Sequence, residues 1–489
     1  MQPLAVLTFL VFIGLSTVSC FRIFQAIIVE TIQQRLFVKT GLKLAKELPH
    51  IHYQTIENVN MLMSVNYFFE IPTIQKSIAM LLVTGLDLAF MGLISMLLLA
   101  FYHPLLLAFD IFLIIGLVIV ILFPYRNALK YAIEESDAKH EVASWLEEIV
   151  KNLILFKMQS HDEYAFEVAD RKLLRYVQER KQHFKSILKH LIGMNALYVF
   201  ANAALLGSGG YLVIKEQLSL GQLVASELIV NALLYSFLRI GFYLEDFYDL
   251  LASSYKLGKL LNLPKDISQQ DAKKEELELI IPSFSLSCDN VSYQGTAQRI
   301  LDRLSFTIPP SDKVAVLAET GRGKSILLDV LSGLREPSTG SIKINNVPLK
   351  EFSTKLYQKN ITLVRHIELL SVSIYDNLVL QNKQITKNQV YSVLDALNLT
   401  ATIESFPNGL ETVVAASHLD IARPELNKLM LARGILTQPN LLLIDGLLDA
   451  VPPIDIPATV KYLQSMDSTV IVATVRQDIA ELFTHRILL

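Results

Sequence analysis

Long apolar stretches in the first half of the chain constrain its fold more than any other feature. Each is about 20 residues or longer, the length that a helix needs to cross the roughly 30 Å hydrocarbon core of a bilayer. Over the whole chain 52% of the residues are hydrophobic and 19% are charged, whereas soluble domains carry about 25% charged residues. The sequence therefore predicts about five membrane spans, over residues 1–21, 77–102, 105–123, 191–214 and 218–238.

Basic residues between the apolar runs predict the topology. Lysine and arginine recur over residues 35–46 and, in larger number, over residues 126–189. Because such loops stay on the cytoplasmic side, we expect both segments inside, and the N-terminus and the turns at 102–104 and 215–217 outside. A cleaved signal peptide is the alternative for the first run, but the usual basic segment before it is missing.

The segment between the third and fourth runs is expected to be helical without lying in lipid. Over residues 125–190, apolar side chains recur every three or four positions among many charges, for example at Val142, Leu146, Ile149 and Leu153. This spacing is typical of amphipathic helices. We therefore expect long helices that project from the membrane on its cytoplasmic side.

Three acidic residues, Asp87, Asp110 and Glu227, lie inside apolar runs. Ionisable groups in lipid are costly, so these three are candidates for a functional role. Contact with a transported substrate and a position beside a water-filled cavity are both open from the sequence.

Charge and cysteine content narrow the chemistry. The formal net charge of -3 gives no indication of a nucleic acid partner. Cys20 and Cys288 are far apart in the sequence, and neither has a neighbour at the spacing of a zinc or redox motif. We therefore expect no nucleic acid partner and two unrelated thiols.

The composition of the chain changes near residue 264. Residues 264–276 are charged and polar, as in a linker. Beyond them, short β-rich runs alternate with helical patterns, as in a soluble α/β domain. We expect a transmembrane domain with long cytoplasmic helical loops over residues 1–263, a linker over 264–279 and an α/β domain over 280–489.

Residues 313–325 have the pattern of a strand, a glycine-bearing loop and the start of a helix. In such a phosphate-binding loop, backbone N–H groups surround the phosphates and the helix N-terminus adds partial positive charge. Lys324 is expected to reach the β- and γ-phosphates, and the Ser325 hydroxyl to ligate Mg²⁺. Ala318 replaces the first glycine of the pattern, which is expected to weaken binding without abolishing it. The predicted nucleotide-binding residues of this loop are Gly321, Arg322, Gly323, Lys324, Ser325 and Ile326.

A second motif ends in a carboxylate. Residues 441–445 are four apolar residues followed by Asp445, the pattern of a buried strand with an acid at its C-terminal end. Doubly wound sheets bind their ligands at that end. We expect Asp445 to hold Mg²⁺ through water, and an aspartate that caps or turns the chain is the alternative.

In their order along the chain, these elements resemble the ABC exporters, and the resemblance covers nearly the whole chain. Residues 288–293 resemble the strand that presents an aromatic side chain to adenine, with Tyr293 in that role. The family has six membrane helices per half, whereas about five are predicted here, and the first run resembles the family's second helix. Further matching segments are 66–70, 220–225, 336–344, 373–378 and 429–436.

The resemblance implies a membrane all-α bundle of the ABC exporter type followed by an α/β P-loop NTPase domain that binds nucleotide. It implies ATP and Mg²⁺ as cofactors. The implied partners are the lipid bilayer, an unknown exported substrate and a second half-transporter in a homodimer or heterodimer. The protein is then an integral, multi-pass protein of the plasma (inner) membrane, with the nucleotide-binding domain in the cytoplasm.

Several positions depart from the family pattern. Gly446 stands where the family has the glutamate that polarises the attacking water, and Val475 where it has the switch histidine. The signature motif aligns with residues 421–425, where its serine and first glycine are Ala422 and Arg423. The Q-loop glutamine falls at Arg365 or His366, and residues 451–453 replace the D-loop pair. Because phosphoryl transfer depends on positioning and electrostatics, we expect binding to survive and hydrolysis to be impaired.

Two functions remain open from the sequence. The first is an exporter half-unit in which ATP binding drives or gates substrate export. The alternative is a non-pumping ATP-binding scaffold or regulatory pseudo-transporter, and whether the chain is an ATPase is left open. The apolar runs exclude a soluble P-loop enzyme.

Overall fold

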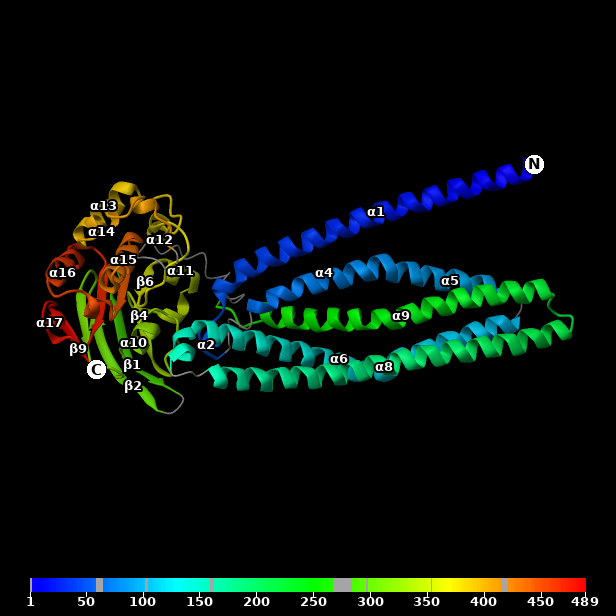
Figure 1. The fold of residues 1–489 in the computed structure, drawn as a ribbon. Helices are drawn as coiled ribbons and strands as arrows, with labels where there is room; N and C mark the ends of the chain where they lie inside the picture. The colour runs from blue at the N-terminus through cyan, green and yellow to red at the C-terminus, as the bar shows by residue number, and fades with distance from the viewer. Residues whose placement is uncertain are drawn as a thin grey trace. The chain divides into compact units, whose positions relative to one another are not determined.

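The computed structural model describes residues 2–58, 65–101, 104–158, 162–266, 284–295, 298–352, 354–414 and 421–489. The chain divides into two compact units, each of which is described by itself below (Figure 1). The first comprises Met1–Ile51 with Thr55–Pro264, and the second His52–Gln54 with Lys265–Leu489. Most of the predicted linker over 264–279 and of the predicted turn at 102–104 lies outside the described residues.

Helices build the first unit, except that Tyr53 and Gln54 of α2 are assigned to the second unit. In chain order they are α1 (Gln2–Glu47), η1 (Leu48–His50), α2 (Tyr53–Asn58), η2 (Asn66–Phe69), α4 (Glu70–Met80), η3 (Leu81–Gly85), α5 (Leu86–Ala100), α6 (Pro104–Lys151), α7 (Leu153–Lys157), α8 (Asp162–Ile214) and α9 (Leu220–Leu261).

Within the described residues, 5 helical stretches are long and apolar enough to cross a membrane, judged by length and composition. Each of them overlaps one of the apolar runs that predicted a span, so the expected set of apolar helices is confirmed. The five stretches are Leu4–His50, Asn66–Ala100, Pro104–Lys151, Asp162–Ile214 and Leu220–Leu261.

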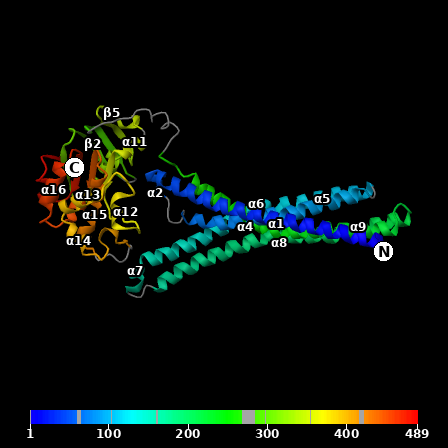
Figure 2. The ribbon, with the colours of Figure 1, turned by 90° about the horizontal axis from the view of Figure 1, so that it is seen from above.

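Two of these helices are far longer than a bilayer requires. Helix α6 has 48 residues and α8 has 53, and at 1.5 Å per residue each exceeds about 70 Å, more than twice the roughly 30 Å of hydrocarbon. Their added length covers most of residues 125–190, so the helices predicted there are confirmed over the residues that the structure describes. Helices α6 and α8 pack along each other, and α9 packs on α5 and α8 (Figures 1 and 2).

The last of the long helices begins where the family resemblance places its start. Ser219 precedes α9, and its Oγ accepts a hydrogen bond from the Gln222 N–H at 3.1 Å. The Gln222 side chain accepts one from the Ser219 N–H at 2.8 Å. This reciprocal capping satisfies donors that the first helical turn leaves unpaired, which fixes the start of α9.

Burial separates the three acids of the apolar runs. Asp110 on α6 is 3% exposed and lies in the helical unit beside the buried Leu106 and Leu113. Neither of its carboxylate oxygens has a hydrogen-bond partner among the described residues. Asp87 on α5 and Glu227 on α9 are exposed in the isolated chain. Asp110 is therefore the only one of these three acids that the packing encloses.

The second unit contains two sheets. The antiparallel sheet has the order β2-β1-β4-β5, and the five-stranded parallel sheet has the order β6-β7-β8-β3-β9. The strands are β1 (Leu286–Gln294), β2 (Arg299–Ile308), β3 (Lys313–Leu317), β4 (Thr339–Ile344), β5 (Val347–Pro348), β6 (Ile361–Val364), β7 (Leu441–Asp445), β8 (Thr469–Thr474) and β9 (His485–Leu488).

Helices surround these sheets. They are α10 (Lys324–Leu331), η6 (Leu349–Glu351), α11 (Thr354–Lys359), α12 (Ile374–Val379), α13 (Lys387–Ala396), α14 (Thr400–Glu404), η7 (Gly409–Glu411), α15 (Arg423–Leu436), η8 (Leu447–Ala450), α16 (Ile456–Ser465) and α17 (Gln477–Ala480). The predicted α/β character of this half is confirmed.

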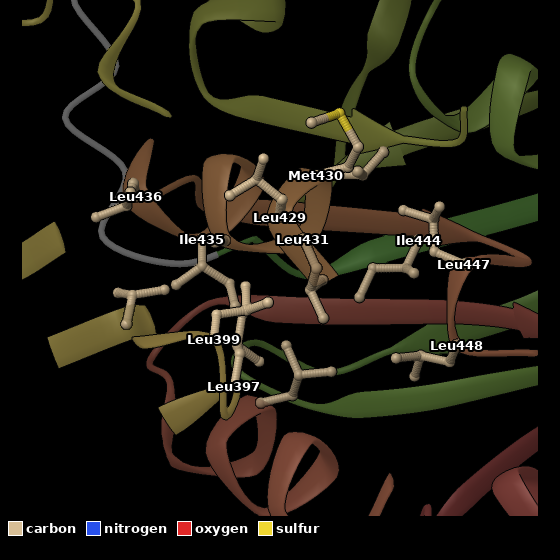
Figure 3. Packing of buried hydrophobic residues seen from close by; sticks show 14 of the residues in the cluster. Leu397, Leu399, Leu429, Met430, Leu431, Ile435, Leu436, Ile444, Leu447 and Leu448 are labelled. Carbon is tan, nitrogen blue, oxygen red and sulfur yellow. The ribbon is translucent and has the colours of Figure 1, made fainter. Parts of the chain in front are cut away.

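The parallel sheet is buried on both faces. Every residue of β7 and β8 is buried, which agrees with the consecutive apolar residues at 441–444 and 470–473. Successive side chains of a strand point to opposite faces, and accordingly Leu442 and Ile444 join one core cluster while Leu441 and Leu443 join another. Side chains of α15 and η8 pack on the first face, as Figure 3 shows. This two-sided packing holds the C-terminal ends of the strands in register.

Candidate functional site

The phosphate loop lies between β3 and α10, as predicted. Gly321 and Gly323 have φ values of 85° and 93°, in the left-handed region that glycine adopts without strain. A Cβ at position 323 would lie 2.9 Å from the Ile300 side chain and 3.2 Å from its carbonyl oxygen, so only glycine fits there. Ala318 is buried, and its N–H donates to the Thr474 carbonyl at 3.4 Å. The loop therefore keeps its turn geometry without the first glycine.

Lys324 spans the phosphate loop. Its Nζ donates to the Ala318 carbonyl at 2.7 Å and to the Glu319 carbonyl at 2.9 Å. Arg322 is exposed and pairs with Glu319 at 3.7 Å, and Ser325 and Ile326 follow in the first turn of α10. The loop therefore gathers a lysine charge and a helix N-terminus, the combination that binds phosphate.

Asp445 ends β7 and lies beside Arg365, which directly follows β6. The Arg365 Nε donates to Asp445 Oδ2 at 2.6 Å. Its Nη2 donates to Asp329 Oδ1 at 2.6 Å and to the Ser325 carbonyl at 2.9 Å. Burial alone would lower the pKa of Arg365, but the hydrogen bonds and charges of Asp329 and Asp445 raise it above its usual range. Arg365 is thus a fixed cation that joins the phosphate-loop helix to the end of β7.

Tyr293 reaches the same group of charges. Its hydroxyl accepts from Arg335 Nη1 at 3.1 Å, and Arg335 Nε donates to Asp329 Oδ2 at 2.8 Å. Arg365 in turn holds the other oxygen of Asp329. The predicted adenine platform and the predicted phosphate loop are therefore connected through two arginines and one buried carboxylate, which is 2% exposed.

Sequence reasoning singled out Arg365 only as a departure from the Q-loop and missed this ion-pair network. A usable signal lies in the strand register. Val364 pairs with Ile444 in parallel strands, which places residue 365 beside residue 445 at the same edge of the sheet. Finding it required knowing that β6 and β7 are neighbours, which the sequence pattern does not show.

Gly446 and Val475 lie at the ends of two neighbouring strands. Asp445 pairs with Ala473, and the Gly446 N–H donates to the Ala473 carbonyl at 3.0 Å. Gly446 has φ of 69°. Asp449 lies close by and is already engaged, because its carboxylate accepts from the Val475 N–H at 3.2 Å and from the Thr474 hydroxyl. The structure brings the two substituted positions together and gives Gly446 a backbone conformation that a glutamate rarely adopts.

The segment that aligns with the family signature, residues 421–425, contains the start of α15. Ala422 is the residue before this helix, and its methyl group offers no hydroxyl. Its N–H donates to the Glu425 side chain at 3.3 Å. Arg423 is exposed at the first helical position. At these two positions the chain therefore provides neither the hydroxyl group nor the small residue of the family signature.

The predicted Mg²⁺ ligands, Ser325 and Asp445, are a poor fit for a hard dication. Mg²⁺ requires near-octahedral oxygen ligands at about 2.0–2.1 Å. Asp445 is the charged member of the pair, and one of its oxygens is held by the Arg365 guanidinium. A dication at Asp445 would have to displace or adjoin a fixed positive charge.

Comparison with known proteins agrees with this geometry. A family model described as ABC transporter matches residues 301–448. The chain is 21% identical over 396 residues to the lactococcin-A transport/processing ATP-binding protein LcnC of Lactococcus lactis, which covers 78% of this chain and 52% of that protein. It is 25% identical over 318 residues to the mitochondrial iron-sulfur clusters transporter ATM1 of Saccharomyces cerevisiae, covering 64% of this chain and 45% of that protein. The chain thus spans about half the length of these curated relatives.

A solved structure shares the fold over nearly the whole chain. It is a bacterial Atm1-family ABC exporter with ATP bound, with a TM-score of 0.82 and 16% identity, covering 94% of this chain and 81% of that one. The long apolar helices and this likeness give the chain the fold of a multi-pass membrane protein. It combines an ABC transporter nucleotide-binding domain with the architecture of an exporter-type half-transporter.

Proposed function

We propose that this chain is a half-transporter that binds ATP at its phosphate loop and pairs with a second half-transporter to drive or gate the export of a substrate. The membrane domain is assigned to residues 1–263, the linker to 264–279 and the nucleotide-binding domain to 280–489. The observation that carries the proposal is the loop of Gly321, Gly323 and Lys324 between β3 and α10, in a chain with long apolar helices. The direction of transport is proposed from the solved Atm1-family ABC exporter whose fold the chain shares.

We further propose that hydrolysis by this chain is impaired. Gly446 offers no carboxylate to orient a water molecule, and Val475 offers no imidazole to contact the γ-phosphate. Ala422 and Arg423 do not offer a partner chain the small, hydroxyl-bearing surface of the signature. Because these groups act by positioning and electrostatics, their loss removes catalysis more than binding. The missing groups favour the second candidate function, a non-pumping ATP-binding scaffold or regulator.

ATP turnover separates the two candidates. The purified full-length protein is expected to bind ATP and to release phosphate slowly when alone. Turnover is then measured with and without candidate partner half-transporters reconstituted in the same vesicles. Turnover that rises only with a partner supports a transporter. Turnover that stays at the level of Lys324→Ala with every partner supports the scaffold.

The topology proposal is tested by cysteine labelling. We propose a plasma (inner) membrane location, with the N-terminus outside and the nucleotide-binding domain in the cytoplasm. A cysteine at position 103 is expected to react with an impermeant maleimide in intact cells, and one at position 139 only after permeabilisation. The opposite pattern would contradict the proposed orientation.

The natural cysteines affect this labelling differently. Cys20 is exposed and has to be replaced, whereas Cys288 is buried in β1. Burial, and to a smaller extent the neighbouring Asp289, raises the pKa of the Cys288 thiol to about 12. Because the thiolate is the reactive form, Cys288 is expected to stay unlabelled in the folded protein, which makes it an internal control for folding.

A further inference from the structure

One guanidinium joins the predicted metal ligand Asp445 to the main chain of Ser325, whose hydroxyl is the other predicted ligand. Arg365 contacts the Ser325 carbonyl through Nη2 at 2.9 Å and the Asp445 carboxylate through Nε at 2.6 Å. Its side chain is only 15% exposed, and that of Asp445 is 8% exposed. A planar guanidinium with directional donors suits such a partly buried carboxylate better than a flexible ammonium group does. The cation beside Asp445 is therefore part of the protein.

The charges of this network balance without a metal ion. Two arginines, Arg365 and Arg335, face two carboxylates, Asp329 and Asp445. In the absence of nucleotide, Mg²⁺ at Asp445 would place two further positive charges against carboxylates that the arginines already neutralise. Removing Arg365 would leave Arg335 paired with Asp329 and would leave Asp445 as an uncompensated acid. Since buried charges require a partner, Asp445 would then attract a cation from solution.

We propose that the Arg365 guanidinium takes the place of Mg²⁺ at this phosphate loop, so that the chain binds ATP without a divalent cation. The inference rests on the proposed function, because it concerns the same nucleotide site. Among the described contacts, Arg365 uses Nε and Nη2, which leaves Nη1 to donate to a phosphate oxygen. Lys324 and Arg365 then neutralise the phosphates from the loop and from the end of β6.

The test compares nucleotide affinity with and without metal. A fluorescent ATP analogue is titrated into the full-length, detergent-solubilised protein in excess Mg²⁺ and in EDTA, and the ratio of the two Kd values is the readout. For the wild type this ratio is expected to stay near one. For Arg365→Gln, EDTA is expected to weaken binding by at least about tenfold, the change that about 1.4 kcal/mol of lost interaction produces.

A matched variant controls for the loss of a positive charge. Arg335→Gln removes an arginine from the same network but leaves the contact between Arg365 and Asp445 in place. Its absolute affinity is free to change because Arg335 touches Tyr293. Its ratio of Kd values is expected to remain near one, and a ratio as high as that of Arg365→Gln would overturn the role of Arg365.

The remaining outcomes distinguish this inference from the proposed function. If the wild type binds the analogue in Mg²⁺ but not in EDTA, metal independence is wrong, while the nucleotide site itself still stands. This result does not depend on whether the variants fold. A ratio near one in Arg365→Gln shows that the guanidinium is not the reason for metal independence. If the wild type binds no better than Lys324→Ala both in Mg²⁺ and in EDTA, the chain has no nucleotide site and the proposed function is wrong.

Discussion

Replacing Lys324 with alanine is expected to abolish ATP binding by the full-length protein. The Lys324 ammonium lies over the phosphate loop, held by the Ala318 and Glu319 carbonyls at 2.7 and 2.9 Å, and a bound phosphate would compete for the same donors. Without this charge the loop loses the ammonium group that acts together with its backbone dipoles on the phosphates. We expect Kd to rise by at least about a hundredfold, which corresponds to about 2.7 kcal/mol.

The measurement is a titration with a fluorescent ATP analogue, and a second lysine provides the control. Lys343 lies on β4 and pairs with Asp289 at 2.7 Å, so Lys343→Ala removes the same type of side chain outside the phosphate loop. It is expected to bind ATP as the wild type does. Equal affinity in the wild type and Lys324→Ala would show that the loop does not bind phosphate.

Restoring the family's catalytic residues together is expected to raise ATP turnover far more than restoring any one of them. The wild-type chain should release phosphate much more slowly than the rate of about 1 per second or more that is usual for enzymes. Groups that act as a unit in catalysis are strongly non-additive, so Gly446→Glu alone is expected to recover little. Its backbone adds a further obstacle, because φ is 69° there and a residue with a Cβ costs roughly 1–2 kcal/mol in that region.

The combined variant carries Gly446→Glu, Val475→His, Ala422→Ser, Arg423→Gly and Arg365→Gln. The last change frees Asp445 from its ion pair. Turnover by this variant is expected to exceed that of the wild type by at least about a hundredfold, the loss that one missing catalytic donor commonly causes. Phosphate release from solubilised protein is measured with Lys324→Ala as the blank. A wild-type rate of about 1 per second or more, absent in that blank, would contradict impaired hydrolysis.

Three properties of this protein follow from the sequence by itself, because each depends on the local order of residues. A run of about 20 apolar residues has few alternatives to a helix in lipid, and each predicted run overlaps a long apolar helix. The phosphate loop is equally local, since a strand, two glycines and a helix start follow one another over residues 313–325. The sequence also indicated a buried strand at 441–445, where every side chain is enclosed.

The tertiary structure decided what surrounds these local elements. Arg365 and Asp445 are 80 positions apart, and they meet because β6 and β7 are neighbours in the sheet, a pairing that no local pattern encodes. The left-handed backbone at Gly446 is likewise imposed where the end of β7 bonds to Ala473 of β8. Hydrophobic periodicity determines which face of an element is buried, but it does not determine which elements become neighbours. The charge beside the phosphate loop could therefore be read only from the folded chain.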